Sequence, residues 1–169
     1  MNWFFITLGY SGLFPKAPGT VGSLVALILG IPLSAYLGSQ LMFTLTLLIS
    51  AIAVKEINKY EQKSAVHDDK RIVIDELAGM WLALSIAPGV MLDFDNIFNY
   101  ENGFVIQAIL SFVFFRYFDI KKPSIIGRID KKMTGGLGVM ADDIVAGFAA
   151  GISSALVWQI ILKLQQYFS

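Results

Sequence analysis

The stretch IVAGFAAGISSALVWQIIL, residues 144–162, contains no charged side chain. Its length lies within the roughly 17–25 apolar residues that a helix needs to cross a bilayer. A second apolar run, VGSLVALILGIPLSAYL, covers residues 21–37. Shorter runs at residues 41–54, 77–92 and 104–115 must use their flanks, tilt or thin the membrane in order to span it. The five runs predict an all-α fold: a polytopic membrane helix bundle of about five transmembrane or membrane-embedded helices, in a single domain over residues 1–169.

The overall composition favours a membrane protein. Hydrophobic residues make up 56% of the chain and charged residues 15%, whereas soluble domains have about 45–50% and about 25%. Short apolar runs also occur as core helices of soluble proteins, which is the alternative. The net charge of zero gives no general attraction to nucleic acid. The absence of cysteine excludes a disulfide framework, a thiolate zinc site and a phosphatase with a cysteine nucleophile.

The distribution of basic residues predicts an orientation. When the five runs are placed alternately across a membrane, the side that carries the N-terminus holds 12 basic residues and the other side holds only Lys163. Those 12 are Lys16, Lys55, Lys59, Lys63, Lys70, Arg71, Arg116, Lys121, Lys122, Arg128, Lys131 and Lys132. Cytoplasmic loops of membrane proteins carry an excess of Lys and Arg. We therefore expect the N-terminus inside the cytoplasm and the C-terminus outside.

Polar residues from distant parts of the chain gather at the predicted cytoplasmic ends of the runs. They are Thr20, Ser23, His67, Asp68, Asp75, Glu76, Arg116, Asp119, Lys122, Asp142 and Asp143. Carboxylates are the ligands that Mg²⁺ prefers, and crowded carboxylates repel each other without a cation between them. Arg and Lys bind phosphate oxygens. Together these groups predict metal-assisted phosphoryl transfer at a membrane surface.

Each of these features also has a purely structural interpretation. The pairs Asp75-Glu76 and Asp142-Asp143 precede apolar runs, where carboxylates are good helix caps. The lysines near residues 121–132 are also typical of topology determinants or contacts to anionic lipid. A lone histidine such as His67 is more often a hydrogen-bonded surface residue than a ligand.

Four segments resemble the motifs of the phosphatidylglycerophosphatase A family. They are GLFPKAPGTVGSL at residues 12–24, HD at 67–68 followed by IVIDELAGMW at 72–81, FRYFDIKKP at 115–123, and GGLGVMADDIVAG at 135–147. The resemblance extends over about residues 9–150, in the family's order and with no departure at the charged positions. It implies Mg²⁺-dependent hydrolysis of phosphatidylglycerophosphate to phosphatidylglycerol and phosphate. It also implies a role in phospholipid biosynthesis at the cytoplasmic face of a bacterial inner membrane.

With this resemblance, the polar residues receive specific roles. Metal binding is expected from Asp68, Asp75, Glu76, Asp142 and Asp143. Catalytic carboxylates are expected among Asp75, Glu76, Asp119, Asp142 and Asp143. Substrate binding is expected from Thr20, Ser23, His67, Arg116 and Lys122. Whether a carboxylate or a water molecule attacks the phosphorus is left open.

Three other functions compete with this one. An ion-coupled transporter also carries charges within membrane helices, although its site lies near the bilayer midplane and not at one edge. A phosphatase acting on a different phosphorylated lipid or small molecule would use the same groups. A non-catalytic membrane scaffold gives no reason for four acidic motifs on one face.

Overall fold

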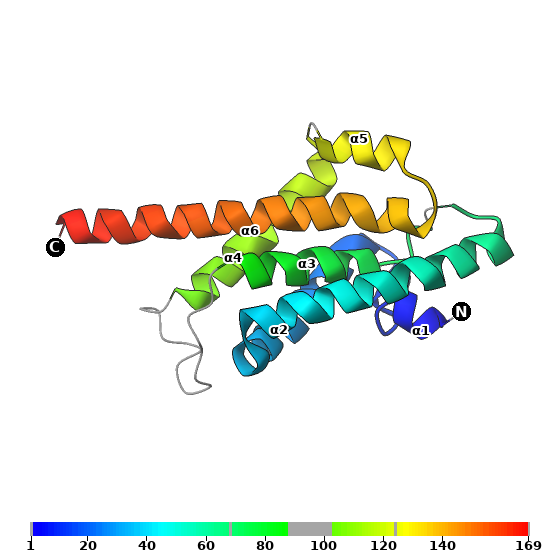
Figure 1. Ribbon diagram of the computed structural model, residues 1–169, viewed down its shortest axis with the longest axis horizontal. Coiled ribbons are helices and arrows are strands. Elements are labelled where there is room, and N and C mark those ends of the chain that lie inside the picture. The colour runs from blue at the N-terminus through cyan, green and yellow to red at the C-terminus, as the bar shows by residue number, and fades with distance from the viewer. Residues whose placement is uncertain (1, 68, 88–102, 124, 169) are drawn as a thin grey trace.

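The computed structural model describes residues 2–67, 69–87, 103–123 and 125–168. These residues form six α-helices, one short 3₁₀ helix at Ser11–Leu13 and no strand (Figure 1). The helices are α1 (Trp3–Ile6), α2 (Pro18–Ser64), α3 (Ile74–Ile86), α4 (Phe104–Lys121), α5 (Ile125–Lys132) and α6 (Gly135–Phe168). The all-α prediction is confirmed.

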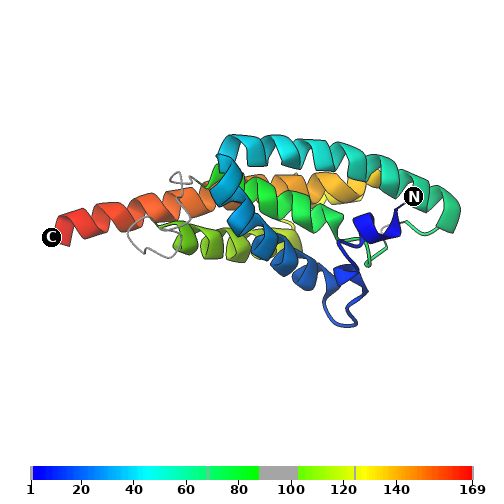
Figure 2. The same ribbon diagram turned by 90° about the horizontal axis from the view of Figure 1, so that it is seen from below.

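Helix α2 is bent sharply at Gly38 into two limbs. Gly38 has φ 75° and ψ 164°, which are not helical and which glycine adopts without steric cost. The limbs, residues 18–37 and 39–64, contain the first two predicted apolar runs. Figure 2 shows both limbs running from the bend toward the end of the molecule that carries the N-terminus. The sequence predicted two separate helices here. In the structure they are the two limbs of α2, which meet at Gly38.

The third helix forms the centre of the bundle. Helix α3 packs against α2 and α6, and α4 packs mainly against α6 (Figure 1). Almost all of α3 from Ile74 to Leu84 is buried, as expected for a helix that is apolar on every side. Trp81 belongs to this core, and its indole Nε1 donates a hydrogen bond of 2.9 Å to the carbonyl oxygen of Ala26.

Glycines bring the backbones of α3 and α6 into contact. A Cβ atom on Gly147 would lie 2.1 Å from the carbonyl oxygen of Gly79, and one on Gly79 would lie 2.6 Å from the carbonyl oxygen of Asp143. Small residues allow membrane helices to approach closely. This contact places the backbone of Asp143 directly beside Gly79 of α3. Gly79 lies about one helical turn after Asp75 and Glu76.

Two helices, α2 and α6, are long and apolar enough to cross a membrane. Their most apolar windows are only 22% and 33% buried within the protein, so most of that apolar surface faces outward, where a bilayer would cover it. Helix α3 has 13 residues, which is about 20 Å at 1.5 Å per residue and shorter than the roughly 30 Å of a hydrocarbon core. The five-helix span count and the orientation remain predictions.

Two segments expected as cytoplasmic loops contain more helix than the sequence indicated. Helix α2 continues through charged residues to Ser64, where Lys59 and Glu56 form an exposed i,i+3 ion pair of 2.6 Å. Helix α5 occupies residues that were expected to lie between the fourth and fifth runs. Both segments are polar, and apolar length alone does not identify helices of that kind.

Candidate active site

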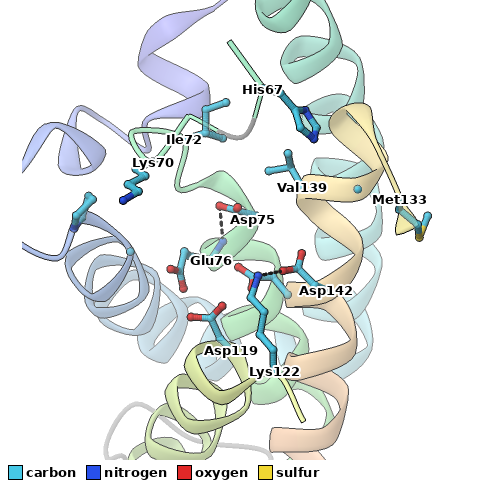
Figure 3. A pocket seen from close by; sticks show the side chains of 14 residues that line it. His67, Lys70, Ile72, Asp75, Glu76, Asp119, Lys122, Met133, Val139 and Asp142 are labelled. Atoms are coloured by element: carbon cyan, nitrogen blue, oxygen red, sulfur yellow. Dashed lines mark hydrogen bonds and ion pairs between the residues drawn. The ribbon is translucent and has the colours of Figure 1, made fainter. Parts of the chain in front are cut away.

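A cavity of about 290 Å³ opens where the starts of α2, α3 and α6 meet the end of α4. Five acidic residues line it, and Figure 3 shows several of their carboxylates pointing toward one another. The acidic residues are Asp75, Glu76, Asp119, Asp142 and Asp143, and the remaining lining includes Pro18, Gly19, His67, Lys70, Ile72, Lys122, Met133, Gly138 and Val139. The structure therefore brings together the acidic residues that the sequence placed in separate motifs, except Asp68, which lies outside the described residues.

The acidic pair of α6 does not cap its helix. Helix α6 begins at Gly135 and has no acidic residue in its first turn. Asp142 and Asp143 therefore lie about two turns inside the helix, where the backbone N–H groups already have partners. Both side chains are nevertheless buried, at 7% and 4% exposure. Because burying a carboxylate is costly without a compensating charge, capping does not explain this pair.

The acidic pair of α3 lies at its helix start, as capping would require. Asp75 and Glu76 are in the first turn, and the backbone N–H of Glu76 donates a 2.9 Å hydrogen bond to Asp75 Oδ1. The carboxylate of Asp75 also interacts with those of Glu76, Asp142 and Asp119. The N-cap position of α3 is Val73, and no side chain makes a capping hydrogen bond there, so capping does not account for Asp75, while Glu76 is turned toward α2 and α4.

Three carboxylates are close enough to share a cation. Oxygen atoms of Asp119, Asp142 and Asp143 all lie within 4.8 Å of one another. Two ligands on opposite sides of one Mg²⁺ are about 4.2 Å apart, since each Mg–O distance is about 2.1 Å. The trio therefore fits a divalent cation after a small inward movement. The sequence-based prediction favoured Asp75 and Glu76 over Asp119 as metal ligands. The distances instead place Asp119 with Asp142 and Asp143.

Charge balance also favours a cation in this cavity. Arg116 pairs with Glu76 and Asp119, and Lys122 Nζ pairs with Asp142 Oδ2 at 2.7 Å. In the described part of the chain, Asp75 and Asp143 have no such basic partner. Five carboxylates against two paired cations leave uncompensated negative charge, which a divalent cation would neutralise.

Arg116 connects three helices at the floor of the site. Its Nη1 atom donates to Glu76 Oε2 at 2.6 Å and to Ser23 Oγ at 2.9 Å, and it lies 2.9 Å from Asp119 Oδ2. Its Nη2 atom donates to Thr20 Oγ1 at 3.3 Å. The Ser23 hydroxyl also lies 2.6 Å from Glu76 Oε2. Predicted residues of α2, α3 and α4 therefore meet in one network.

The beginning of α2 must lack a side chain for this network to form. A Cβ atom on Gly19 would lie only 2.2 Å from Glu76 Oε1. Pro18 occupies the first helical turn, where its missing N–H costs no hydrogen bond. The Pro18-Gly19 dipeptide thus starts α2 and leaves space for the Glu76 carboxylate.

His67 lines the cavity but stays outside the acidic cluster. Its Nδ1 atom lies 2.6 Å from Glu61 Oε1, and its side chain is largely exposed. These contacts match a hydrogen-bonded surface histidine, and its expected role in substrate binding remains a prediction.

The loop between α2 and α3 contains one group that the sequence analysis did not select. Lys70 lines the cavity, and its only signal in the sequence was its position beside the His67-Asp68 motif. Its neighbours in the chain have a different role: Arg71 and the Tyr60 hydroxyl donate hydrogen bonds to Asp69. The bond from Arg71 holds the pKa of Asp69 well below its usual range. This cluster fixes the loop that carries Lys70.

The chain is similar to known proteins over most of its length. Residues 4–158 match the sequence model of a family described as Phosphatidylglycerophosphatase A. The chain belongs to this family. All the predicted site residues fall within the matched range, and the resemblance seen in the four motifs is confirmed.

Relatives in three bacteria cover most of the chain. Phosphatidylglycerophosphatase A of Haemophilus influenzae is 34% identical over 84% of this chain and 79% of its own length. Phosphatidylglycerophosphatase A of Escherichia coli is 37% identical over 89% and 80%. A protein of Bacteroides thetaiotaomicron named Putative phosphatidylinositol-3-phosphatase is 35% identical over 89% of both chains. No solved structure matches the chain.

Membership in this family confirms that the chain is an enzyme, a phosphoric monoester hydrolase. The cavity described above contains a candidate cation site and the basic side chain of Lys122, and Arg116 lies against it through its contact with Asp119. Two further cavities, both beside α1, have no basic side chain in their lining.

Proposed function

We propose that this chain hydrolyses phosphatidylglycerophosphate to phosphatidylglycerol and phosphate, with Mg²⁺, in phospholipid biosynthesis. The observation that carries the proposal is the meeting of Asp119, Asp142 and Asp143 within 4.8 Å, beside Arg116, at one end of apolar helices. Two relatives named for this activity share more than a third of their residues with this chain over most of its length.

The basic and hydroxyl groups are assigned to the phosphate. Arg116 offers a planar fork that suits phosphate oxygens, and its Nη1 atom lies 2.9 Å from Asp119 Oδ2 of the acidic trio. Thr20 and Ser23 already contact its guanidinium group, which holds the fork in one orientation. Lys122 adds a second positive charge from the end of α4.

The carboxylates are assigned to the cation and to proton transfer. Asp119, Asp142 and Asp143 would hold Mg²⁺, with Glu76 and Asp68 as further candidates. When bound, Mg²⁺ neutralises negative charge on the phosphoryl oxygens. Asp75 lines the cavity without a basic partner among the described residues, so we assign it to accept the proton of the attacking water molecule.

We further propose that the site faces the cytoplasm of a bacterial inner membrane. The two limbs of α2, then α3, α4 and α6, run in alternating directions, and the cavity lies at the end where α5 is found (Figures 1 and 2). The loops at that end carry most of the Lys and Arg residues. In membrane proteins, loops with an excess of Lys and Arg lie in the cytoplasm. The headgroup would then enter the cavity while the acyl chains remain among the apolar helix faces.

A second candidate substrate is phosphatidylinositol 3-phosphate. The relative from Bacteroides thetaiotaomicron, at 35% identity over 89% of the chain, is named for that activity. Both lipids present a phosphate monoester on a headgroup, so the acidic trio and Arg116 suit either one.

The experiment that tests the proposal is phosphate release by the purified full-length chain from each lipid in mixed micelles. We expect release from phosphatidylglycerophosphate that depends on Mg²⁺, stops with EDTA and is lost in Asp143→Asn. Faster hydrolysis of phosphatidylinositol 3-phosphate would transfer the assignment to the second candidate. Release that is unaffected by EDTA would contradict the metal assignment.

A further inference from the structure

The basic side chains around the cavity fall into two groups. Arg116 and Lys122 are paired with carboxylates of the acidic cluster. Lys70 is exposed, lines the same cavity, and has no ion pair with any residue that the structure describes. In Figure 3, Lys70 lies apart from Lys122, whose Nζ atom reaches Asp142. The ammonium group of Lys70 is therefore an exposed positive charge in the cavity lining. No described carboxylate of the acidic cluster forms an ion pair with it.

The size of the cavity determines which part of a lipid it holds. Its volume of about 290 Å³ is at the lower end of the roughly 300–1,000 Å³ of small-molecule sites. A polar headgroup fits this space, whereas two acyl chains do not. With its terminal phosphate beside Asp119, Asp142 and Lys122, which line the cavity, such a headgroup must leave through the cavity mouth toward its glycerol backbone.

In both candidate substrates the headgroup is joined to diacylglycerol through a second phosphate, a diester. That diester carries one negative charge and lies between the terminal phosphate and the acyl chains, at the level of the mouth. We propose that Lys70 is a specificity-determining residue that binds this diester phosphate. The site then prefers glycerophospholipids with a diester and a monoester phosphate over phosphatidic acid, which has only the monoester. This inference rests on the proposed function.

The position of Lys70 suits this role. Its neighbours Asp69 and Arg71 are joined to each other and to Tyr60, and Arg71 also lies over the Trp3 ring at 5.1 Å. The backbone at Lys70 is therefore held firmly, while its side chain is exposed. A lysine ammonium is a mobile point charge, which suits a diester that presents its free oxygens from more than one angle.

The test compares two lipids with the purified full-length chain, with Mg²⁺, in mixed micelles of matched surface concentration. The substrates are phosphatidylglycerophosphate and phosphatidic acid, and the variants are Lys70→Ala and Lys70→Arg. Lys63→Ala is the matched control, because Lys63 is an exposed lysine in the last turn of α2 that does not line the cavity. Helix content by circular dichroism shows that each variant is folded.

We expect Lys70→Ala to raise KM for phosphatidylglycerophosphate by about threefold to tenfold, the size of one exposed charge interaction, with kcat within twofold. KM for phosphatidic acid should change by less than twofold. Lys70→Arg should restore most of the preference, and Lys63→Ala should match the wild type. An equal effect of Lys70→Ala on the two lipids, or no effect on either, would overturn the assignment.

A separate measurement distinguishes failure of this inference from failure of the proposed function. Titration calorimetry with Mg²⁺ compares binding of two soluble headgroups, glycerophosphoglycerol phosphate and glycerol 3-phosphate. Lys70→Ala should weaken only the first. A wild type that binds the first more tightly, yet releases phosphate from no lipid, would contradict the proposed function and support the Lys70 site. Equal binding of the two headgroups by the wild type would overturn the Lys70 site.

Discussion

The two halves of α6 have similar apolar character but opposite surroundings. Residues 135–151 contribute the buried glycines and alanines, together with the buried carboxylates of Asp142 and Asp143. In residues 152–168 only Ser154 and Trp158 are buried, and Leu156, Ile160 and Leu164 are more than half exposed. Figure 1 shows this second half extending beyond the other helices. The difference follows residue size. Small residues in the first half allow the backbone of α6 to contact α3, whereas the second half carries large apolar side chains that face outward.

The largest expected effect concerns the buried carboxylates of the first half. Asp142→Asn and Asp143→Asn should each lower kcat/KM by at least about 100-fold, because even residues that only support metal ligands contribute 10–100-fold. Helix content should be unchanged, since neither residue caps α6. Phosphate release and circular dichroism measure the two effects. Asp95→Asn is the control, because Asp95, which lies outside the described residues, falls in the basic-free segment between the third and fourth apolar runs that the charge pattern predicts on the other side of the membrane. Turnover within a few-fold of the wild type in both variants would remove these residues from the site.

The second prediction concerns the exposed half and its contact with lipid. Leu156→Arg should reduce the free energy of membrane insertion by about 2.5–3.5 kcal/mol if Leu156 lies near the bilayer centre, which is roughly 100-fold or more in the ratio of inserted to non-inserted chains. Glycosylation mapping of inserted chains would measure it, with Leu156→Ala as the control for loss of size. A soluble protein would tolerate arginine at such an exposed position, so unchanged behaviour would argue against a membrane-facing second half.

The third prediction tests the close contact of α3 and α6. Gly147→Val should lower the free energy of unfolding by about 1–3 kcal/mol, the usual cost of overpacking, because a Cβ atom there meets the Gly79 carbonyl oxygen at 2.1 Å. Thermal unfolding in detergent gives the change. Ser153→Val, on a half-buried position of the same helix, provides the comparison. Equal effects of the two variants would show that the helices are not held together by this contact.

The smallest effect is expected for truncation of a side chain that faces outward. Ile160→Ala should change the free energy of unfolding by less than about 0.5 kcal/mol and leave kcat/KM within twofold. Ile160 is 57% exposed and lies far along α6 from the acidic residues. A larger loss would reveal a protein partner on this surface.

Local patterns in the sequence were sufficient for the apolar helices and for the type of chemistry, but not for the polar helix α5 or the charged end of α2. Apolar runs located every long helix, and the residues Asp75, Glu76, Asp119, Asp142 and Asp143 were all selected before their arrangement was known. The start of α6 was harder to predict. The run of glycines at residues 135–138 is typical of a turn, yet α6 begins there, so the acidic pair lies inside the helix.

The sequence by itself determined that this chain is helical, apolar and equipped with acidic and basic groups at one end, because side-chain polarity and periodicity act locally. Only the tertiary structure decided which of those groups meet. Asp119 joins Asp142 and Asp143 because α4 packs against α6, while Glu76 is held by Arg116. Lys70 entered the site only through the folding of the loop before α3. Distances between side chains on different helices depend on packing angle and register, which close contacts such as that of Gly79 with Gly147 set.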